Sequence, residues 1–169
     1  RYSSVDDELH SGLAGKLGYA KKWGKEKWKY NANANGEYTS ENFKTVERIR
    51  NVEFSRDWNV TNQNAAEIWL GSARFTAQQS QRLKISAQSD YLQLGQTFTG
   101  FKNAGNLDVN TNGWTVKAVA SYLTTQDSTY GTEFFRQRSR AQKNFKNKYY
   151  VGALSESESN TATAATTNN

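Results

Sequence analysis

The chain has 169 residues, a net charge of +6 and neither Pro nor Cys, and 36% of it is hydrophobic. Its aromatic content of 13% argues against disorder, because disordered chains are poor in aromatic residues. The absence of Cys excludes disulfides, thiolate metal sites and cysteine catalysis. The absence of Pro favours a chain that is almost entirely paired strand, since Pro cannot donate a hydrogen bond to a ladder.

Hydropathy restricts the ways in which the chain could meet a membrane. No apolar run approaches the roughly eighteen residues that a spanning helix needs, and no stretch has the sequence of a signal peptide. The mean hydropathy of -0.89 does not exclude a transmembrane β-barrel, because only alternate residues of its strands face lipid. We therefore expect a mature chain or an internal piece of a longer one.

The N-terminal part begins with two runs that alternate between apolar and polar residues. Residues 9–20 fit a period of two better than the helical period, and residues 28–35 alternate aromatic or Ala residues with Lys and Asn. The charged stretch 21–26 between them predicts a turn, so the two runs should form a hairpin. Residues 46–58 alternate too, but arginines share the parity of the apolar residues, which makes this the least lipid-like segment.

The same alternation recurs along the rest of the chain, with short polar turns in between. Asn112 and Gly113 form a strong hairpin signal. The further strand candidates are 69–77, 83–91, the residues around Leu107 and Val109, 114–122, 134–141 and 149–154.

Together these runs predict an all-β fold, an antiparallel meander of about eight or nine strands within residues 1–154. Residues 155–169 contain no aromatic residue and are expected to form a polar flexible tail or loop.

Several apolar faces place Trp or Tyr near a strand end and small residues in the middle, which is typical of aromatic girdles around a hydrocarbon band. This pattern favours a transmembrane β-barrel, or part of one, over a soluble sheet whose aromatics are simply good strand formers. The girdle candidates are Tyr19, Trp23, Trp28, Tyr30, Trp69, Tyr91, Trp114 and Tyr122. The lumen-facing polar candidates are Lys29, Asn31, Asn33, Lys84, Gln88, Asp90 and Lys117, which in a soluble sheet would form a solvated face.

Residues 28–38, 47–59 (ERIRNVEFSRDWN), 134–138 and 149–160 resemble strands of large outer-membrane β-barrel proteins of Bacteroidota. The resemblance implies an outer-membrane location and a barrel larger than this chain. In that phylum such barrels serve as secretion translocons, nutrient importers or porins. Complete outer-membrane barrels usually end on an aromatic residue, whereas this chain ends in a polar stretch, so we expect an internal segment of a longer polypeptide.

Catalysis is not expected from the sequence. His10 is the only imidazole, and the adjacent Ser11 would point to the opposite face of a strand. A lipid hydrolase would need another serine and a carboxylate within reach of His10. The chain has no phosphate-binding loop, no metal-spaced cluster and no nucleic-acid recognition motif, so we expect no cofactor, no metal and no nucleic-acid partner.

The expected function is a porin-like transport or secretion pore, or a membrane anchor, without enzymatic activity. Its expected partners are the lipid bilayer, lipopolysaccharide and other subunits of an outer-membrane complex, and inward-facing Lys and Arg would favour anions in the lumen. The alternative is a soluble or cell-surface β-sheet domain that binds glycan or protein through exposed aromatics. That alternative would place Trp28, Trp69 and Trp114 in a closed core or together on one binding face.

Overall fold

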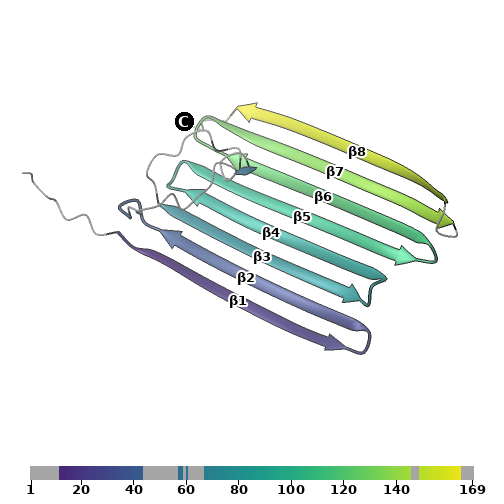
Figure 1. Cartoon of the computed structure of the whole chain (residues 1–169). Helices are drawn as coiled ribbons and strands as arrows, with labels where there is room; N and C mark the ends of the chain where they lie inside the picture. Colours follow the sequence, from purple (N-terminus) through teal and green to yellow (C-terminus); the bar gives the residue numbers. More distant parts are fainter. Residues whose placement is uncertain (1–11, 44–56, 59, 61–66, 146–148, 165–169) are drawn as a thin grey trace, which may run out of the picture.

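The computed structural model describes residues 12–43, 57, 58, 60, 67–145 and 149–164. In these ranges eight antiparallel strands form one sheet, in which each strand pairs with its neighbours in sequence (Figure 1). The predicted all-β antiparallel meander is therefore confirmed. No helix in the described part of the chain is long and apolar enough to cross a membrane. The strands are β1 (Ala14–Lys25), β2 (Trp28–Thr39), β3 (Ile68–Gln79), β4 (Leu83–Leu94), β5 (Phe98–Thr111), β6 (Trp114–Gln126), β7 (Tyr130–Phe145) and β8 (Tyr149–Ala164).

The sheet has two unlike ends. At one end, which we call the turn end, short turns join β1 to β2, β3 to β4 and β5 to β6 (Figure 1). At the other end, which we call the loop end, the connections lead from β2 to β3, β4 to β5 and β6 to β7. The β2–β3 connection is the longest of these and includes Trp58 and Val60.

The sheet is open, because within the described residues β1 and β8 pair with only one neighbour each. Every residue of both strands is exposed. An unpaired strand edge is a template for pairing with a further strand, and proteins usually cover or disrupt such edges. In the described part of the chain, β1 and β8 are therefore two long, exposed edges.

Two boundaries differ from the sequence prediction. β1 continues through the expected turn to Lys25, because Trp23 lies opposite Tyr30 and stacks on it with ring centroids 5.6 Å apart. The turn consists of Glu26 and Lys27 only. β8 continues to Ala164, so the division expected at residue 154 falls inside a strand. Most of the 46–58 run and all of residues 1–11 lie outside the described residues.

The strand register sorts the side chains onto two faces. What we call the aromatic face is formed by the even-numbered residues of β2 and β6 and the odd-numbered residues of the other six strands. The remaining residues form the opposite face, which we call the polar face. Successive strand residues point to opposite faces, so a slip of one residue in any pair would exchange the two sets.

A small apolar core lies on the polar face at the loop end. Trp58 and Val60 pack there against Leu92, Phe98 and Leu123. Leu92 is fully buried, whereas most large apolar side chains of the aromatic face are exposed. Of the described residues between β2 and β3, Trp58 and Val60 are therefore packed on the polar face.

Gly100 makes the anchorage of Trp58 possible, because a Cβ at this position would approach Cε3 of Trp58 to 2.8 Å. We expect Gly100→Ala to lower the free energy of unfolding by about 1–3 kcal/mol, as overpacked cores do. The matched control is Gly105→Ala on the same strand, where a Cβ would meet nothing within 4 Å. Urea unfolding followed by circular dichroism measures both variants, and equal stabilities would contradict the packing of Trp58 on β5.

The β5–β6 turn consists of Asn112 and Gly113, with φ angles of 46° and 79°. These are the positive angles of a type I′ hairpin turn, which the Asn-Gly pair predicts. A Cβ at position 113 would also approach the Asn144 carbonyl oxygen to 2.9 Å.

We expect Gly113→Ala to destabilise the sheet by about 1–2 kcal/mol, the cost of a left-handed backbone at a residue with a side chain. Asn112→Gly removes a side chain at the neighbouring positive φ and should change stability by no more than a few tenths of a kcal/mol. Thermal unfolding of the two variants provides the comparison. A neutral Gly113→Ala would show that the turn can change type without cost.

Candidate functional site

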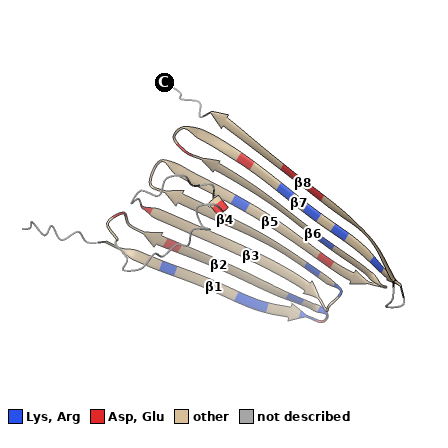
Figure 2. Ribbon diagram, turned by 45° about the horizontal axis from the view of Figure 1, so that its top comes forward, with Lys and Arg blue, Asp and Glu red and all other residues tan. Residues whose placement is uncertain are grey.

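Charge separates the two faces. No Asp, Glu, Lys or Arg lies on the aromatic face in strands β2 to β6, and the charged residues of this face are Lys21, Lys25, Glu133 and Lys143 on β1 and β7. The cations of the polar face are Lys16, Lys22, Lys29, Arg74, Lys84, Lys102, Lys117, Arg136, Arg138 and Arg140. Figure 2 marks the positions of Lys and Arg along the strands in blue and those of Asp and Glu in red. Its carboxylates are Glu37, Asp90, Asp108, Glu156 and Glu158.

The register places the residues singled out by the sequence on opposite sides of the sheet. Lys29, Asn31, Asn33, Lys84, Gln88, Asp90 and Lys117 all lie on the polar face. Tyr19, Trp23, Trp28, Tyr30, Trp69, Tyr91, Trp114 and Tyr122 all lie on the aromatic face. Trp28, Trp69 and Trp114 are outside the apolar core, and Trp69 and Trp114 are about half exposed.

Aromatic side chains near the loop end form a row of direct cross-strand pairs. Tyr38 and Trp69 have ring centroids 4.5 Å apart. Trp69 Nε1 donates to Glu67 and the Tyr91 hydroxyl donates to Gln93, so both polar groups are bonded on the loop-end side of their rings. The row consists of the pairs Tyr38–Trp69, Tyr91–Phe101 and Tyr122–Phe135.

A second row lies near the turn end. Trp23 and Trp28 each stack on Tyr30, and Lys143 places its ammonium group 5.2 Å from the centre of the Trp114 ring. The same ammonium donates to the Asn112 carbonyl in the turn. The row consists of Trp23, Trp28, Tyr30, Trp114, Phe145 and Tyr149, with Leu83 and Val109 in between on β4 and β5.

Small residues fill the aromatic face between the two rows. Ala34, Ala73, Ala87, Gly105 and Ala120 occupy much of its centre on β2 to β6. The polar pair at this height is mutually satisfied, because the Ser89 hydroxyl donates to Asn103 over 2.7 Å. On β7 and β8 the centre is more polar and includes Gln137, Ser139 and Ser157. Tyr19 and Phe75 also lie between the rows.

The two rows are slanted in parallel across the strands. At the loop end each successive pair lies two residues further from the strand ends than the pair two strands before it. Tyr91 is opposite Gly71, two residues beyond Trp69, and Tyr122 is opposite Asn103, two residues beyond Phe101. At the turn end the row moves outward in the same direction, from Tyr30 on β2 to Trp114 on β6 and Tyr149 on β8. Both rows therefore shift by about one residue per strand and keep their separation.

On the polar face the charges are linked into short networks. Arg74 donates through Nε to Gln88 over 2.9 Å, and the Gln88 amide donates to both carboxylate oxygens of Asp90. Lys117 lies 3.7 Å from Asp108. These contacts connect β3 to β4 and β5 to β6.

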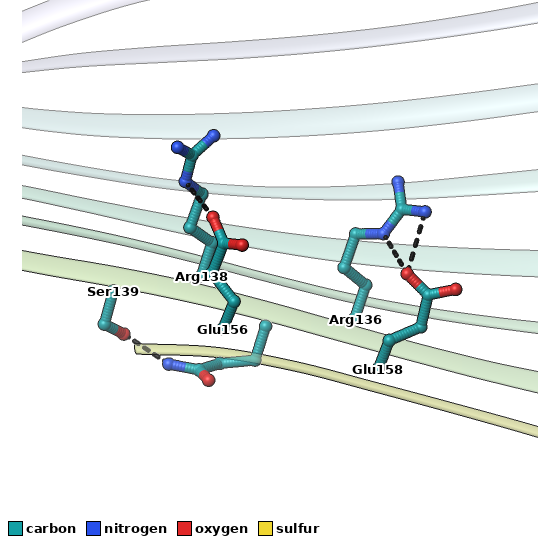
Figure 3. Close-up of polar contacts among 6 residues, drawn as sticks. Arg136, Arg138, Ser139, Glu156 and Glu158 are labelled. Carbon is teal, nitrogen blue, oxygen red and sulfur yellow. Dashed lines mark hydrogen bonds and ion pairs between the residues drawn. The ribbon is translucent and has the colours of Figure 1, made fainter. Parts of the chain in front are cut away.

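The densest network crosses β7 and β8. Arg136 pairs with Glu158 at 3.1 Å, and Arg138 pairs with Glu156 at 2.7 Å. Figure 3 shows both pairs on one side of the ribbon and Ser139 on the other. The alternation within residues 134–141 and 149–154 does not by itself predict which face of the sheet these side chains occupy. The sequence contains a signal for these ion pairs, because Arg occupies alternate positions from 136 to 140 and Glu occupies positions 156 and 158.

A cleft of about 340 Å³ lies between Asp57 and the polar face. Lys102, Ser121, Arg136 and Asn160 contribute polar atoms to its lining, and Leu123 and Phe134 contribute apolar ones. The cleft borders the core under Trp58, which the sequence pattern did not reveal. Trp58 contacts this core although it is far from Leu92, Phe98 and Leu123 in the sequence.

Among the described residues no three His, Cys, Asp or Glu side chains are grouped so that they could hold a metal ion. His10 and Ser11 lie outside the described residues. Comparison with protein-family models, curated proteins and solved structures finds no match for the chain.

Both side chains of the Arg138–Glu156 pair are exposed, so the contribution of the pair to the free energy of unfolding should be small and sensitive to salt. We expect Arg138→Glu to cost about 0.5–1 kcal/mol, because it places two carboxylates opposite each other. The swapped variant, Arg138→Glu with Glu156→Arg, should recover most of that loss at low salt. A double-mutant cycle of unfolding free energies at low salt and at high salt measures the coupling. A coupling that salt does not weaken would contradict an exposed ion pair.

Proposed function

We propose that the chain forms part of the wall of a transmembrane β-barrel, with the aromatic face against lipid and the polar face lining a water-filled lumen. The proposed role is passage of other molecules, by transport or secretion, without catalysis. The proposed membrane is the bacterial outer membrane, as the resemblance to Bacteroidota barrels implies. Lipid contact is assigned to β2 to β6, where the aromatic face has no charge.

The observation that carries this proposal is the parallel slant of the two aromatic rows. A shift of about one residue per strand, with about 3.4 Å per residue and about 4.8 Å between strands, is a slant of about 35°. Strands of outer-membrane barrels are tilted by about 35–45° from the membrane normal. Aromatic girdles run parallel to the membrane plane. On strands tilted by this angle, they would therefore cross the strands with the slant that the two aromatic rows have.

The spacing of the rows supports the same assignment. Trp114 and Tyr122 are eight residues apart on β6, and Phe145 and Phe135 are ten residues apart on β7. At the slant of the rows, separations of eight to ten residues are heights of about 22–28 Å. The apolar band of outer-membrane barrels is about 25 Å tall and has aromatic residues at both borders.

The charges of the polar face require water at the depth of this band. Midway between the rows, Arg74, Lys117 and Arg138 lie on the polar face of their strands. A Lys or Arg facing lipid at the middle of a bilayer costs about 2–4 kcal/mol. A hydrated lumen removes this cost, so the polar face is assigned to the inside of the ring.

The ring needs more strands than these eight. The interior of an eight-stranded barrel is filled by its own side chains, whereas here Trp58 and Val60 also lie over the polar face. If β8 closed onto β1 at the observed slant, the offset would be about eight residues. β8 beyond about Glu156 would then have no partner among the described residues. Unpaired backbone is excluded from a bilayer, so the exposed edges of β1 and β8 are assigned to further strands.

The chain has no Cys, so single-cysteine variants test the proposal cleanly. Ala87 and Ala104 lie at nearly the same height on neighbouring strands but on opposite faces. In lipid vesicles, a membrane-impermeant maleimide should label Ala104→Cys much faster than Ala87→Cys, because a thiol in lipid is shielded from water and does not ionise. The labelled fraction against time is the readout.

The competing interpretation, a soluble or cell-surface sheet, predicts the reverse order. Ala87 is exposed in the sheet, whereas Ala104 is half-buried, so Ala87→Cys would react faster if water covered both faces. Labelling in detergent-free buffer and after unfolding in urea provides the accessible reference for each thiol. Faster labelling of Ala87→Cys in vesicles would overturn the proposed lipid-facing assignment.

A further inference from the structure

One cross-strand line of the polar face is unusually rich in cations. The register places Lys29, Gln78, Lys84, Asp108, Lys117 and Arg140 side by side on six consecutive strands, from β2 to β7. The line therefore holds four cations and one carboxylate. We call Lys29, Lys84, Lys117 and Arg140 the cationic stripe.

Little of this positive charge is neutralised. Asp108 lies directly between Lys84 and Lys117 in the register and pairs with Lys117 at 3.7 Å. Arg140 donates to the neutral side chain of Gln142. In the part of the chain that the structure describes, no ion pair is formed by Lys29, Lys84 or Arg140. By contrast, Arg136 and Arg138 are both paired with Glu.

The surroundings of the stripe at its β2 end are also suited to anions. A hollow of about 830 Å³ near the turn end is lined by Lys29, Arg82, Gln78, Gln81, Ser80 and Asn110. This lining supplies two cations together with amide and hydroxyl donors, and no carboxylate. Backbone bonding fixes the position of the β3–β4 turn, because the Asn110 N–H donates to the Arg82 carbonyl over 2.7 Å.

The stripe crosses the strands at a right angle, whereas the aromatic rows are slanted. Lys29 therefore lies level with the turn-end row, next to Trp28 and Tyr30, and Arg140 lies deeper, several residues from Phe145. The stripe runs from the border of the proposed apolar band towards its middle. Rings of Lys and Arg in this position are the means by which anion and phosphate pores select their solutes.

We propose that the cationic stripe binds soluble multivalent anions of the phosphate class. Neighbouring strands are about 4.8 Å apart, so Lys117 and Arg140 can contact one phosphate-type group together. The place of this site inside a lumen rests on the proposed function. The anion binding itself rests on the register and on the charges of Lys29, Lys84 and Arg140, which form no ion pair among the described residues.

Inorganic pyrophosphate is the probe, and its binding to the purified full-length protein is followed by ³¹P NMR in zwitterionic detergent. We expect Lys84→Gln combined with Lys117→Gln to raise the dissociation constant by about tenfold, since local potential sets the local anion concentration. Asp108→Asn should lower the dissociation constant, because it removes the carboxylate between the two lysines.

The matched control is Lys21→Gln combined with Lys25→Gln, which changes the net charge equally but on the aromatic face. It should leave pyrophosphate binding unchanged. Equal binding by wild type and by the Lys84/Lys117 variant, or an equal loss in the control, would overturn the stripe as a site. Far-ultraviolet circular dichroism checks that each variant keeps its sheet.

Two further measurements complete the test. The first distinguishes a soluble phosphate ligand from a lipid headgroup, and the second distinguishes failure of the anion site from failure of the proposed function. If lipid headgroups occupied the stripe, adding an anionic phospholipid to the micelles would displace pyrophosphate, and this result would overturn a soluble ligand. Maleimide labelling of Ala87→Cys and Ala104→Cys is measured independently of pyrophosphate binding. Lipid-shielded Ala87→Cys together with binding that ignores the stripe would overturn the inference and leave the proposed function standing. Stripe-dependent binding with Ala87→Cys labelled freely would support the site and overturn the lumen.

Discussion

The strand register is the constraint on which the rest of this structure depends. Seven antiparallel pairings, each without a slip, bring every charged residue of β2 to β6 to one face and leave the other face uncharged. A shift of one residue in any pair would mix the two sets beyond it. Local features fix the register at several points, including the Asn112–Gly113 turn, the Trp23–Tyr30 stack and the Ser89–Asn103 bond.

Burial contributes little to this sheet as it stands. Its core consists of Trp58, Val60 and a few side chains near the loop end, and large apolar groups such as Leu17, Trp69 and Tyr149 are exposed. In water, such a surface with two open edges would be prone to association. In a bilayer the same surface is solvated by lipid, and the edges are satisfied by further strands. The proposed membrane environment therefore accounts for the exposed apolar surface and for the two open edges, both of which a soluble sheet would have to cover.

The polar face combines paired and unpaired charge in different places. Near β8, Arg136 and Arg138 of β7 are paired with glutamates of β8, which ties the last two strands together in a region without buried side chains. Towards the turn end, the cations outnumber the carboxylates, and Asp108 is shared between two lysines in the register. Ion pairs in the first region hold strands to each other, whereas the excess charge in the second is available to a solute. The same residue types thus have different roles on one face, set by which strand lies opposite.

The sequence by itself determined the strands and their alternation, because a period of two, an Asn-Gly turn and the absence of Pro are local properties of the chain. It also separated Lys29 from Trp28 and Lys84 from Leu83, since parity within a strand decides which of its residues share a face. The sequence did not place the end of β1 or of β8, because charged residues such as Lys21 and Glu156 remain in a strand when they pair across it. Only the tertiary structure decided which residues of different strands share a height. The slant of the aromatic rows, the cationic stripe and the packing of Trp58 on Gly100 all depend on pairings between residues far apart in the chain, and no local pattern specifies these.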